Sequence, residues 1–336
     1  MESFFIFKGD IIKGKNILCT GGSGSFGKAF IKKALSQDVK RIVVFSRDEL
    51  KQYEMQQELK DDRVRYFLGD IRDKQRLVTA FHGIDICVAA AALKQVPALE
   101  YDSLEGVKTN IIGSQNIIEA AIETGVKKVI ALSSDKAVEP LNLYGATKLV
   151  SEKLFISGNS YASGTATKMS CVRYGNVIAS RGSVIPLFLQ QAKSKVLKVT
   201  DYRMTRFFIT LDKATDFVID AIKSMDGAEI FIPRMPSCTI EEIAEVIADK
   251  YNCKIEEIGI RPGEKLHEKL ITKGEVVVNQ GSRYIVIPSF GLFDRGDITG
   301  NILHDFEYSS DTNDFLSKEE ISKVVDTVDI GCKCKC

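Results

Sequence analysis

The chain has 336 residues, of which 44% are hydrophobic and 27% are charged, as is typical of a soluble globular protein. Its net charge of +1 gives no overall field that would attract nucleic acid or an anionic membrane. No apolar run approaches the roughly 18 residues of a membrane-spanning helix, and residues 1–7 are too short and too acidic for a signal peptide. We therefore expect a cytoplasmic protein that binds neither membranes nor nucleic acids.

The eight cysteines do not form the pattern of a disulfide framework. Cys19, Cys87 and Cys171 lie in apolar runs, where a free thiol behaves as a small hydrophobe. Three more alternate with lysine at the C-terminus: Cys332, Cys334 and Cys336. Because this tail lacks the C-x₂-C spacing and the nearby His of a zinc site, we favour a solvated, redox-sensitive tail over metal ligation. No metal site is indicated elsewhere.

The first half of the chain alternates short apolar runs with stretches of helical periodicity. We predict strands at residues 16–20, 41–46, 64–68, 85–89, 128–133 and 168–174. Helices between them include residues 49–59 and 104–124, the second opened by a capping box of Asp102 and Glu105. This alternation predicts an α/β protein with a Rossmann-like, doubly wound parallel sheet that is covered on both faces.

After Tyr174 the regular alternation ends. We predict helices at residues 184–195, 212–225 and 239–251, the last opened by the capping box of Thr239 and Glu242. Short extended pieces separate them, which indicates a smaller mixed α/β domain. The expected division is a Rossmann domain at residues 1–175, a mainly substrate-binding domain at 176–310 whose chain crosses back to the sheet, and a C-terminal helix with the cysteine tail at 311–336.

A glycine-rich turn follows the first strand and opens the first helix. Gly21, Gly24 and Gly27 permit a tight turn, a close approach of backbone to a pyrophosphate, and close packing of helix on strand. The helix N-terminus would then face the phosphates. This position makes a dinucleotide site more plausible than a turn with no ligand. The expected contacts here are Thr20, Gly21, Ser23, Gly24, Ser25, Phe26 and Gly27.

The end of the second strand indicates which dinucleotide is bound. Ser46 and Arg47 stand there, and Lys51 follows one helical turn later. These groups suit the 2′-phosphate of NADP, which a carboxylate at the strand tip would repel. Asp48 is such a carboxylate, but it could instead cap the following helix. NADP is therefore favoured over NAD.

The next two strand ends complete the predicted cofactor site. Asp70 and Ile71 close the third strand, where the carboxylate can accept a hydrogen bond from the adenine amino group. Ala90 and Ala91 follow the fourth, where small side chains let a cofactor lie against the strand ends, although small residues there also serve ordinary packing. Lys94 stands either at the junction of cofactor and substrate or in solvent.

The most informative segment follows the fifth strand. Tyr144 and Lys148 lie one helical turn apart, so their side chains share a face. There the ammonium could lower the phenol pKa from about 10 and let it take a proton from a sugar hydroxyl. Asp135 and Lys136 add an acid and an amine base, which points to elimination of water. Lys136 could instead serve only a phosphate, and Asp135 could cap a turn.

Substrate residues are expected after the sixth strand and in two arginine-containing segments. Guanidinium groups bind phosphate oxygens bidentately, so the clusters at residues 203–206 and 261–265 suit a diphosphate, with surface salt bridging as the alternative. The candidate substrate contacts are Lys94, Asn176, Val177, Arg206, Arg261 and Glu264.

The chain resembles the extended short-chain dehydrogenase/reductase family in the segments TGGSGSFG, SRDELKQ, GDIRD, AAALK, LSSDKA, NLYGATK, RYGNV, RMTRF and RPGEKLHE. Within it, residues from about 13 to 310 are similar to the inverting UDP-N-acetylglucosamine 4,6-dehydratases, which begin pseudaminic acid synthesis. Ser134 stands where members commonly have Thr, which keeps the hydroxyl. Tyr144 is typically absent from the longer, membrane-anchored retaining relatives, which favours the inverting branch.

The resemblance implies a catalytic set of Ser134, Asp135, Lys136, Tyr144 and Lys148. Tyr144, assisted by Lys148, would deprotonate the C4 hydroxyl of UDP-N-acetylglucosamine as hydride passes to a tightly held NADP⁺. Lys136 would remove the C5 hydrogen, Asp135 would protonate the leaving C6 hydroxyl, and hydride would return to C6 with C5 reprotonated from the opposite face. A homo-oligomer and the C5 stereochemistry are expected from the family alone.

Three other interpretations stay open at this point. A UDP-sugar 4-epimerase or ketoreductase would use Tyr144 and Lys148 alone, but it needs no acid for a C6 hydroxyl. The reaction could stop at a released 5,6-unsaturated sugar nucleotide, which the sequence does not exclude. A non-catalytic NADP-binding regulator would need none of the four groups Asp135, Lys136, Tyr144 and Lys148.

Overall fold

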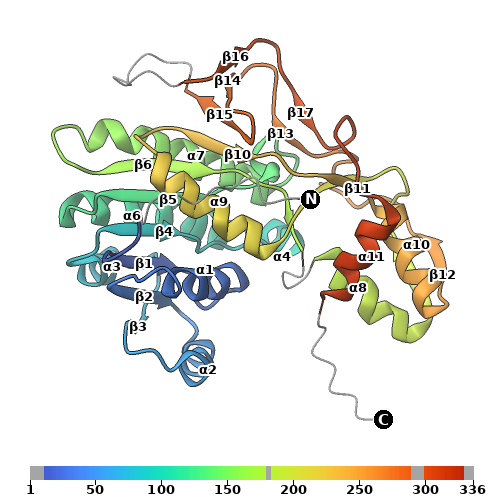
Figure 1. The fold of residues 1–336 in the computed structure, drawn as a ribbon, viewed down its shortest axis with the longest axis horizontal. Helices are drawn as coiled ribbons and strands as arrows, with labels where there is room; N and C mark the ends of the chain where they lie inside the picture. Colours follow the sequence, from blue (N-terminus) through green and yellow to red (C-terminus); the bar gives the residue numbers. More distant parts are fainter. Residues whose placement is uncertain (1–10, 179–182, 289–298, 329–336) are drawn as a thin grey trace.

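The computed structural model describes residues 11–178, 183–288 and 299–328. Its centre is a ten-stranded sheet of order β16-β14-β15-β10-β6-β5-β4-β1-β2-β3 (Figure 1). The parallel strands are β1 (Asn16–Thr20), β2 (Arg41–Ser46), β3 (Val64–Leu68), β4 (Ile86–Ala89), β5 (Lys128–Leu132), β6 (Lys168–Val172) and β10 (Ile230–Pro233). Antiparallel β14 (Val276–Asn279), β15 (Arg283–Ile287) and β16 (Asn301–Leu303) extend one edge. The predicted Rossmann-like sheet is confirmed.

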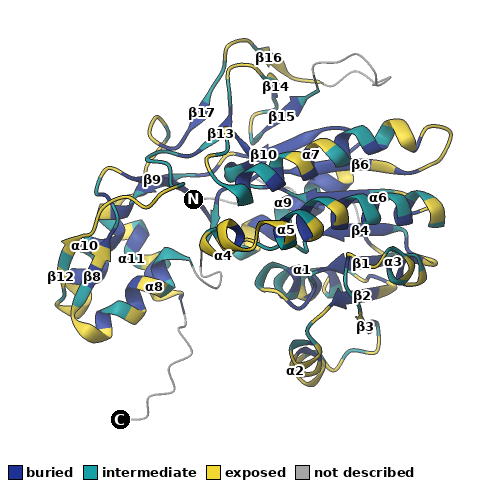
Figure 2. Cartoon of the chain, turned by 180° about the vertical axis from the view of Figure 1, so that it is seen from behind, coloured by how far each residue is buried: buried dark blue, intermediate teal, exposed yellow. Residues whose placement is uncertain are grey.

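Helices cover both faces of this sheet. The helices α1 (Ser25–Leu35) and α9 (Leu211–Ser224) lie on one face (Figure 1), and α3 (Lys74–Phe81), α6 (Gly113–Thr124) and α7 (Leu143–Tyr161) lie on the other (Figure 2). The helix α2 (Glu49–Leu59) follows β2 at the β3 edge. Strands covered on both sides need apolar residues throughout, which explains the short apolar runs in the sequence. Cys19, Cys87 and Cys171 are buried in this core, as predicted.

The predicted helix at residues 104–124 is present, but its first part is irregular. After α4 (Val96–Tyr101), the chain forms α5 (Ser103–Gly106), a π-helical segment η1 (Val107–Ile112) and α6. The predicted capping box is wrong, because the Asp102 side chain makes no capping hydrogen bond. Glu105 instead pairs with Arg72 and Lys108. Asn110 in η1 accepts from the backbone N–H of Leu93 and donates to its carbonyl, which fixes the chain beyond β4.

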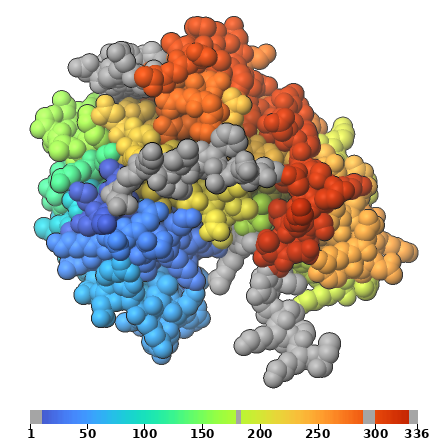
Figure 3. All heavy atoms as spheres, viewed as in Figure 1, coloured from blue at the N-terminus to red at the C-terminus, as the bar shows by residue number. Residues whose placement is uncertain are grey.

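Several segments from the second half of the chain build a smaller lobe around a separate apolar cluster. Its helices are α8 (Val184–Gln191), α10 (Ile240–Tyr251) and α11 (Lys318–Asp326), beside the paired strands β8 (Val196–Val199) and β12 (Lys254–Glu257). The predicted capping box of Thr239 and Glu242 opens α10 and is confirmed. In the space-filling view the orange of α10 and the red of α11 lie to one side of the blue elements of the parallel sheet (Figure 3).

Short strands join the lobe to the sheet. They are β7 (Asn176–Val177), β9 (Thr205–Ile209) and β11 (Ser237–Thr239) in one small sheet, and β13 (Lys269–Ile271) paired with β17 (Tyr308–Ser309). None of the described helices is both long and apolar enough to cross a bilayer. The cysteine tail lies outside the described residues.

A buried ion pair ties the antiparallel edge to the parallel core. Arg173 follows β6 and is 1% exposed. Its guanidinium donates to Glu152 of α7 at 3.1 and 2.5 Å and to Glu275, just before β14, at 3.1 and 3.0 Å. It also donates to the carbonyl of Leu270 at 2.7 Å. Two carboxylates and a carbonyl thus satisfy one buried cation, and the three segments are held together.

Replacing Arg173 should destabilise the fold strongly. In Arg173→Met the carboxylates of Glu152 and Glu275 lose their counter-charge, and we expect the free energy of unfolding in urea to fall by about 3–5 kcal/mol. The control is Lys250→Met, because Lys250 and Asp326 are both exposed and pair at the surface, where an ion pair contributes little. Similar unfolding curves for the two variants would contradict this role of Arg173.

Candidate active site

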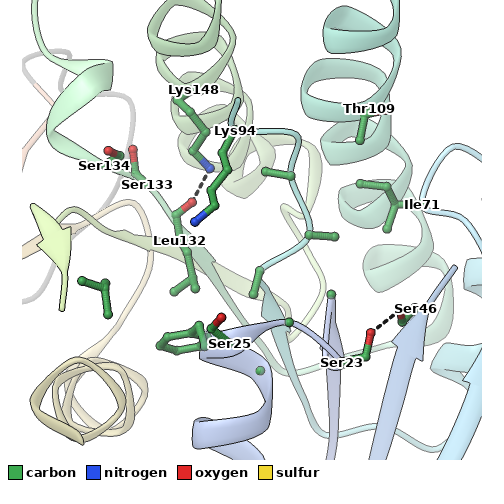
Figure 4. A pocket seen from close by; sticks show the side chains of 18 of the residues that line it. Ser23, Ser25, Ser46, Ile71, Lys94, Thr109, Leu132, Ser133, Ser134 and Lys148 are labelled. Atoms are coloured by element: carbon green, nitrogen blue, oxygen red, sulfur yellow. Dashed lines mark hydrogen bonds between the residues drawn. The ribbon is translucent and has the colours of Figure 1, made fainter. Parts of the chain in front are cut away.

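A cavity of about 960 Å³ lies at the carboxyl ends of the parallel strands. It is lined by the turns that follow β1 to β5, by the start of α7, and by the segment after β6 (Figure 4). The carboxyl ends of parallel strands are where open α/β sheets bind their ligands. One cavity therefore brings together most of the residues that the sequence singled out.

The predicted residues divide into two groups by their relation to this cavity. Those that line it are Gly21, Ser23, Gly24, Ser25, Phe26, Gly27, Ser46, Arg47, Lys51, Asp70, Ile71, Ala90, Ala91, Lys94, Ser134, Asp135, Lys136, Tyr144, Lys148, Asn176 and Val177. Those that do not line it are Thr20, Arg206, Arg261 and Glu264. Thr20 lies beneath the lining, where its Oγ1 accepts from the backbone N–H groups of Ala90 and Ala91 at 3.1 and 3.2 Å.

The glycine turn forms a cradle that side chains would fill. Gly21 has φ +65°, and a Cβ there would lie 2.9 Å from the Cα of Ala91. A Cβ on Gly27 would lie 2.5 Å from the Cα of Gly22, so only glycine lets α1 start this close to the turn. The N-cap of α1 is Gly24, which has no side chain to cap the helix. The first N–H groups of α1 therefore face the cavity, an arrangement that fits a dinucleotide pyrophosphate.

Cationic and hydroxyl groups gather beyond β2. The Oγ atoms of Ser46 and Ser23 are 2.6 Å apart (Figure 4). The Asp48 carboxylate accepts from the backbone N–H of Lys51 at 2.9 Å and pairs with its ammonium. The alternative that Asp48 caps α2 is thus confirmed. Because the Lys51 ammonium neutralises this carboxylate, Asp48 adds no net negative charge beside Ser46 and Arg47.

Asp70 is engaged by two arginines. Burial raises the pKa of its carboxyl, but hydrogen bonds from Arg72 and the charge of Arg47 outweigh burial and leave the pKa below its ordinary value. The Arg72 guanidinium donates to Oδ2 at 2.9 and 2.7 Å, and Arg47 lies 3.5 Å away. Contact of Asp70 with an adenine stays a prediction.

The turn after β5 carries the acid and the amine. It is the 3₁₀ turn η2 (Asp135–Ala137), whose N-cap Ser134 donates to Asp135 Oδ1 at 2.6 Å. Asp135 is 1% exposed, and its Oδ2 lies 3.1 Å from the Lys136 Nζ. A Cβ on Gly145, in the first turn of α7, would clash with the backbone oxygen of Lys136. Glycine at this position therefore lets η2 pack directly against the helix that carries Tyr144.

The electrostatics of Tyr144 differ from the expectation. The Tyr144 pKa is raised to about 12, mainly by burial and also by the Asp135 carboxylate, while the Lys136 ammonium and a hydrogen bond with Ser134 oppose the rise. Lys148 instead donates to the carbonyl of Leu132 on β5 (Figure 4), and burial lowers its own pKa. The predicted lowering of the Tyr144 pKa by Lys148 is thus not found in this structure, because burial dominates.

Glu268 is a site residue that the sequence did not reveal. It is 1% exposed, and its Oε1 lies 2.9 Å from the Lys136 Nζ. Burial lowers the Lys136 pKa, but the carboxylates of Asp135 and Glu268 outweigh burial and hold the pKa above its ordinary value. A single carboxylate in the charged segment RPGEKLHE gives no signal of burial, so only the folded chain identifies it.

The arginine segments lie close to this carboxylate. The Arg206 guanidinium donates to the carbonyls of Thr205, Leu266 and Lys265 at 2.7, 2.9 and 3.0 Å. It therefore holds the chain that carries Glu268. Arg261 is exposed and Glu264 is partly buried. Contact of these side chains with a diphosphate stays a prediction.

Fold and site together are those of the extended short-chain dehydrogenases/reductases: a dinucleotide cradle, and a Tyr and a Lys one turn apart on the helix after the fifth strand. Residues 17–288 match the family model described as "Polysaccharide biosynthesis protein". The chain belongs to this family, within the extended short-chain class.

Comparisons with individual proteins agree with this placement. The inverting UDP-N-acetylglucosamine 4,6-dehydratase of Campylobacter jejuni (strain 81-176) is 46% identical over 330 residues, which cover 94% of this chain and 98% of that protein. The UDP-glucose 4-epimerase of Rickettsia conorii is 40% identical, with coverage of 94% and 96%. The X-ray structure of Pen from Bacillus thuringiensis superposes with a TM-score of 0.88 at 39% identity, covering 94% of this chain and 98% of that one.

Proposed function

We propose that this protein is an NADP-dependent UDP-N-acetylglucosamine 4,6-dehydratase that inverts C5. The observation that carries the proposal is the Asp135–Lys136 pair, which lines one cavity with Tyr144 and a dinucleotide cradle. The 46% identity to the Campylobacter dehydratase over almost the whole chain supports it. The product would be UDP-2-acetamido-2,6-dideoxy-β-L-arabino-hex-4-ulose, a precursor in pseudaminic acid synthesis.

The cofactor is proposed to lie along the cradle. Gly21, Gly24 and the start of α1 would hold the pyrophosphate, and Ser46, Arg47 and Lys51 the 2′-phosphate of the ribose. When bound, the nicotinamide would accept a hydride from the sugar C4 and return it to C6, so the resting form is NADP⁺ and no outside reductant is needed. The residues around it must then manage the protons.

Tyr144 is proposed to take the proton of the C4 hydroxyl. Its pKa of about 12 means that the phenol is protonated at neutral pH, so it needs positive charge nearby to act as a base. The Lys136 ammonium already favours the phenolate, and Lys148 lines the same cavity one turn further along α7. Both lysines would assist this step.

The Asp135–Lys136 pair is proposed to carry out the elimination. At rest the pair is a carboxylate and an ammonium 3.1 Å apart. One proton passing from Lys136 to Asp135 makes an amine and a carboxylic acid, which are the base and the acid that the reaction needs. The amine then takes the C5 proton, which the C4 ketone acidifies, while the acid protonates the C6 hydroxyl and water leaves. Both groups thus return to their resting charge.

A UDP-sugar 4-epimerase is the second candidate, because the Rickettsia relative carries that name. It would use Tyr144 and Lys148 and leave the Asp135–Lys136 pair without a chemical role. The homo-oligomer, the cytoplasmic location and the domain limits at residues 175 and 310 stay predictions.

Incubation with UDP-N-acetylglucosamine in D₂O, without added reductant, should yield the C5-inverted 4-keto-6-deoxy sugar nucleotide with one deuterium at C5. The product and its deuterium content are measured by ¹H NMR, and Tyr144→Phe serves as the inactive control. Formation of UDP-N-acetylgalactosamine would support the epimerase instead. Olefinic signals would indicate release of the 5,6-unsaturated nucleotide, and no turnover would leave a non-catalytic regulator.

The preference for NADP should depend on the cations beyond β2. In the double variant Arg47→Ala, Lys51→Ala we expect affinity for NADP⁺ to fall by about 10- to 100-fold. This fall corresponds to the loss of a charge-assisted hydrogen bond, which contributes about 1.5–3 kcal/mol. Affinity for NAD⁺ should not fall. Isothermal titration of cofactor-stripped protein measures both, and Lys32→Ala, at a surface pair with Glu58, is the control. An equal loss for both cofactors would argue against a 2′-phosphate site here.

A further inference from the structure

Glu268 contacts the proposed catalytic amine from outside the cavity. Lys136 lines the cavity and Glu268 does not, yet Glu268 Oε1 is 2.9 Å from the Lys136 Nζ. The Lys136 ammonium also lies 3.1 Å from Asp135 Oδ2. It is therefore held between two buried carboxylates, those of Glu268 and Asp135. Because Glu268 has no access to the cavity, its effect on a substrate must pass through Lys136.

The backbone of Glu268 is fixed on both sides by Ser310. The Glu268 N–H donates to Ser310 Oγ at 2.9 Å, and the Ser310 N–H donates to the Glu268 carbonyl at 2.8 Å. Ser310 Oγ also lies 2.6 Å from Thr205 Oγ1 on β9. The pairing of β13 with β17 continues this connection directly after Glu268. The carboxylate thus stands on a rigid support, as a residue that fixes a catalytic geometry requires.

The charges around Lys136 make Glu268 difficult to replace. The groups that face this amine are the carboxylates of Asp135 and Glu268, the phenol of Tyr144, and the cations of Arg206 and Lys265. Arg206 Nε and Lys265 Nζ each lie 3.8 Å from the Glu268 carboxylate. Without Glu268, three cations would share the single carboxylate of Asp135. The ammonium would then lose both its second anchor and part of its stabilising charge.

We propose that Glu268 is a positioning residue that holds the Lys136 amine in place to take the C5 proton and leaves the Asp135 carboxyl free to serve the C6 hydroxyl. This inference rests on the proposed dehydration. It gives the second half of the chain a role in the site. Among the described residues of that half, Glu268 is the one carboxylate within salt-bridge distance of Lys136.

Glu268→Gln tests the inference through kinetics. A misplacement of about 1 Å can cost about 100-fold in rate, so we expect kcat to fall by about 10- to 100-fold. KM should not change, because Glu268 does not reach the cavity.

The pH profile gives a second test. At high pH the rate falls when the Asp135–Lys136 pair loses its proton. Since Glu268 raises the Lys136 pKa, this fall should occur at lower pH in the variant than in the wild type.

Two further variants control for general damage to the site. Glu139→Gln removes a nearby carboxylate that pairs with Lys269 and not with Lys136, and it should leave kcat and the pH profile unchanged. Glu268→Asp keeps the charge at a shorter reach, so it should lower kcat while keeping more of the wild-type pH profile than Glu268→Gln does. A Glu268→Gln enzyme with the wild-type kcat and pH profile would overturn the inference.

A measurement without turnover separates this inference from the proposed function. Trace acetylation with acetic anhydride, followed by mass spectrometry of the Lys136 peptide, gives the pH at which this amine titrates. It should titrate lower in Glu268→Gln than in the wild type; equal titration overturns the inference even if dehydration is observed. If wild-type protein does not dehydrate the sugar nucleotide, the proposed function fails while this titration still decides the role of Glu268. If Glu268→Gln does not fold, Glu268→Asp decides instead: its shorter reach should lower kcat, and a wild-type kcat in that variant overturns the inference.

Discussion

The contact between the turn Asp135–Ala137 and the first turn of α7 is the constraint on which the site depends. Gly145 permits it, since any side chain there would meet the backbone oxygen of Lys136. The contact sets a buried carboxylate, an ammonium and a phenol side by side at the end of β5. Each group then alters the others: Asp135 raises the pKa of both Lys136 and Tyr144, and Lys136 opposes the rise at Tyr144. Their proposed chemistry follows from this proximity.

The later part of the chain completes a site that begins in the Rossmann half. Two buried charge clusters make the connection: Arg173 with Glu152 and Glu275, and Lys136 with Asp135 and Glu268. In each cluster, one carboxylate comes from the region of α7 or η2 and the other from residues 268–275. Removing the cation at the centre of either cluster leaves two carboxylates without that counter-charge, which is costly in a buried site. The two halves are thereby locked in one arrangement around the cavity.

Much of this architecture could be predicted from sequence, because its causes are local. The first three strands and α2 have the predicted bounds, since a strand buried on both faces must be a short apolar run and Asp48 caps α2. The glycine turn was recognisable because glycine alone tolerates φ +65° next to Ala91. The lining of the cavity by the predicted cofactor residues follows from the rule that parallel strands end at one edge.

What could not be predicted depends on tertiary contacts. The π-helical segment at Val107–Ile112 and the failed capping box at Asp102 reflect partners for Glu105 and Asn110 that lie far along the chain. The hydrophobic periodicity of the sequence does not show that Glu268 is buried, or that the Arg206 guanidinium donates its hydrogen bonds to backbone carbonyls. Nor does the spacing of Tyr144 and Lys148 predict the Tyr144 pKa, because burial, a property of the whole fold, sets it.

The central claim is that the Lys136 amine removes the C5 proton, and deuterium incorporation at C5 in Lys136→Ala tests it most directly. A positioned base contributes about 10²–10⁴ in rate, so this variant should exchange C5 at least about 100-fold more slowly than the wild type. C4 oxidation, followed by cofactor absorbance in a single turnover, should persist in the variant but run more slowly, because the Lys136 ammonium also favours the Tyr144 phenolate. C5 exchange is therefore compared per molecule oxidised at C4. Exchange of C5 at the wild-type rate would contradict the assignment of Lys136 as the base.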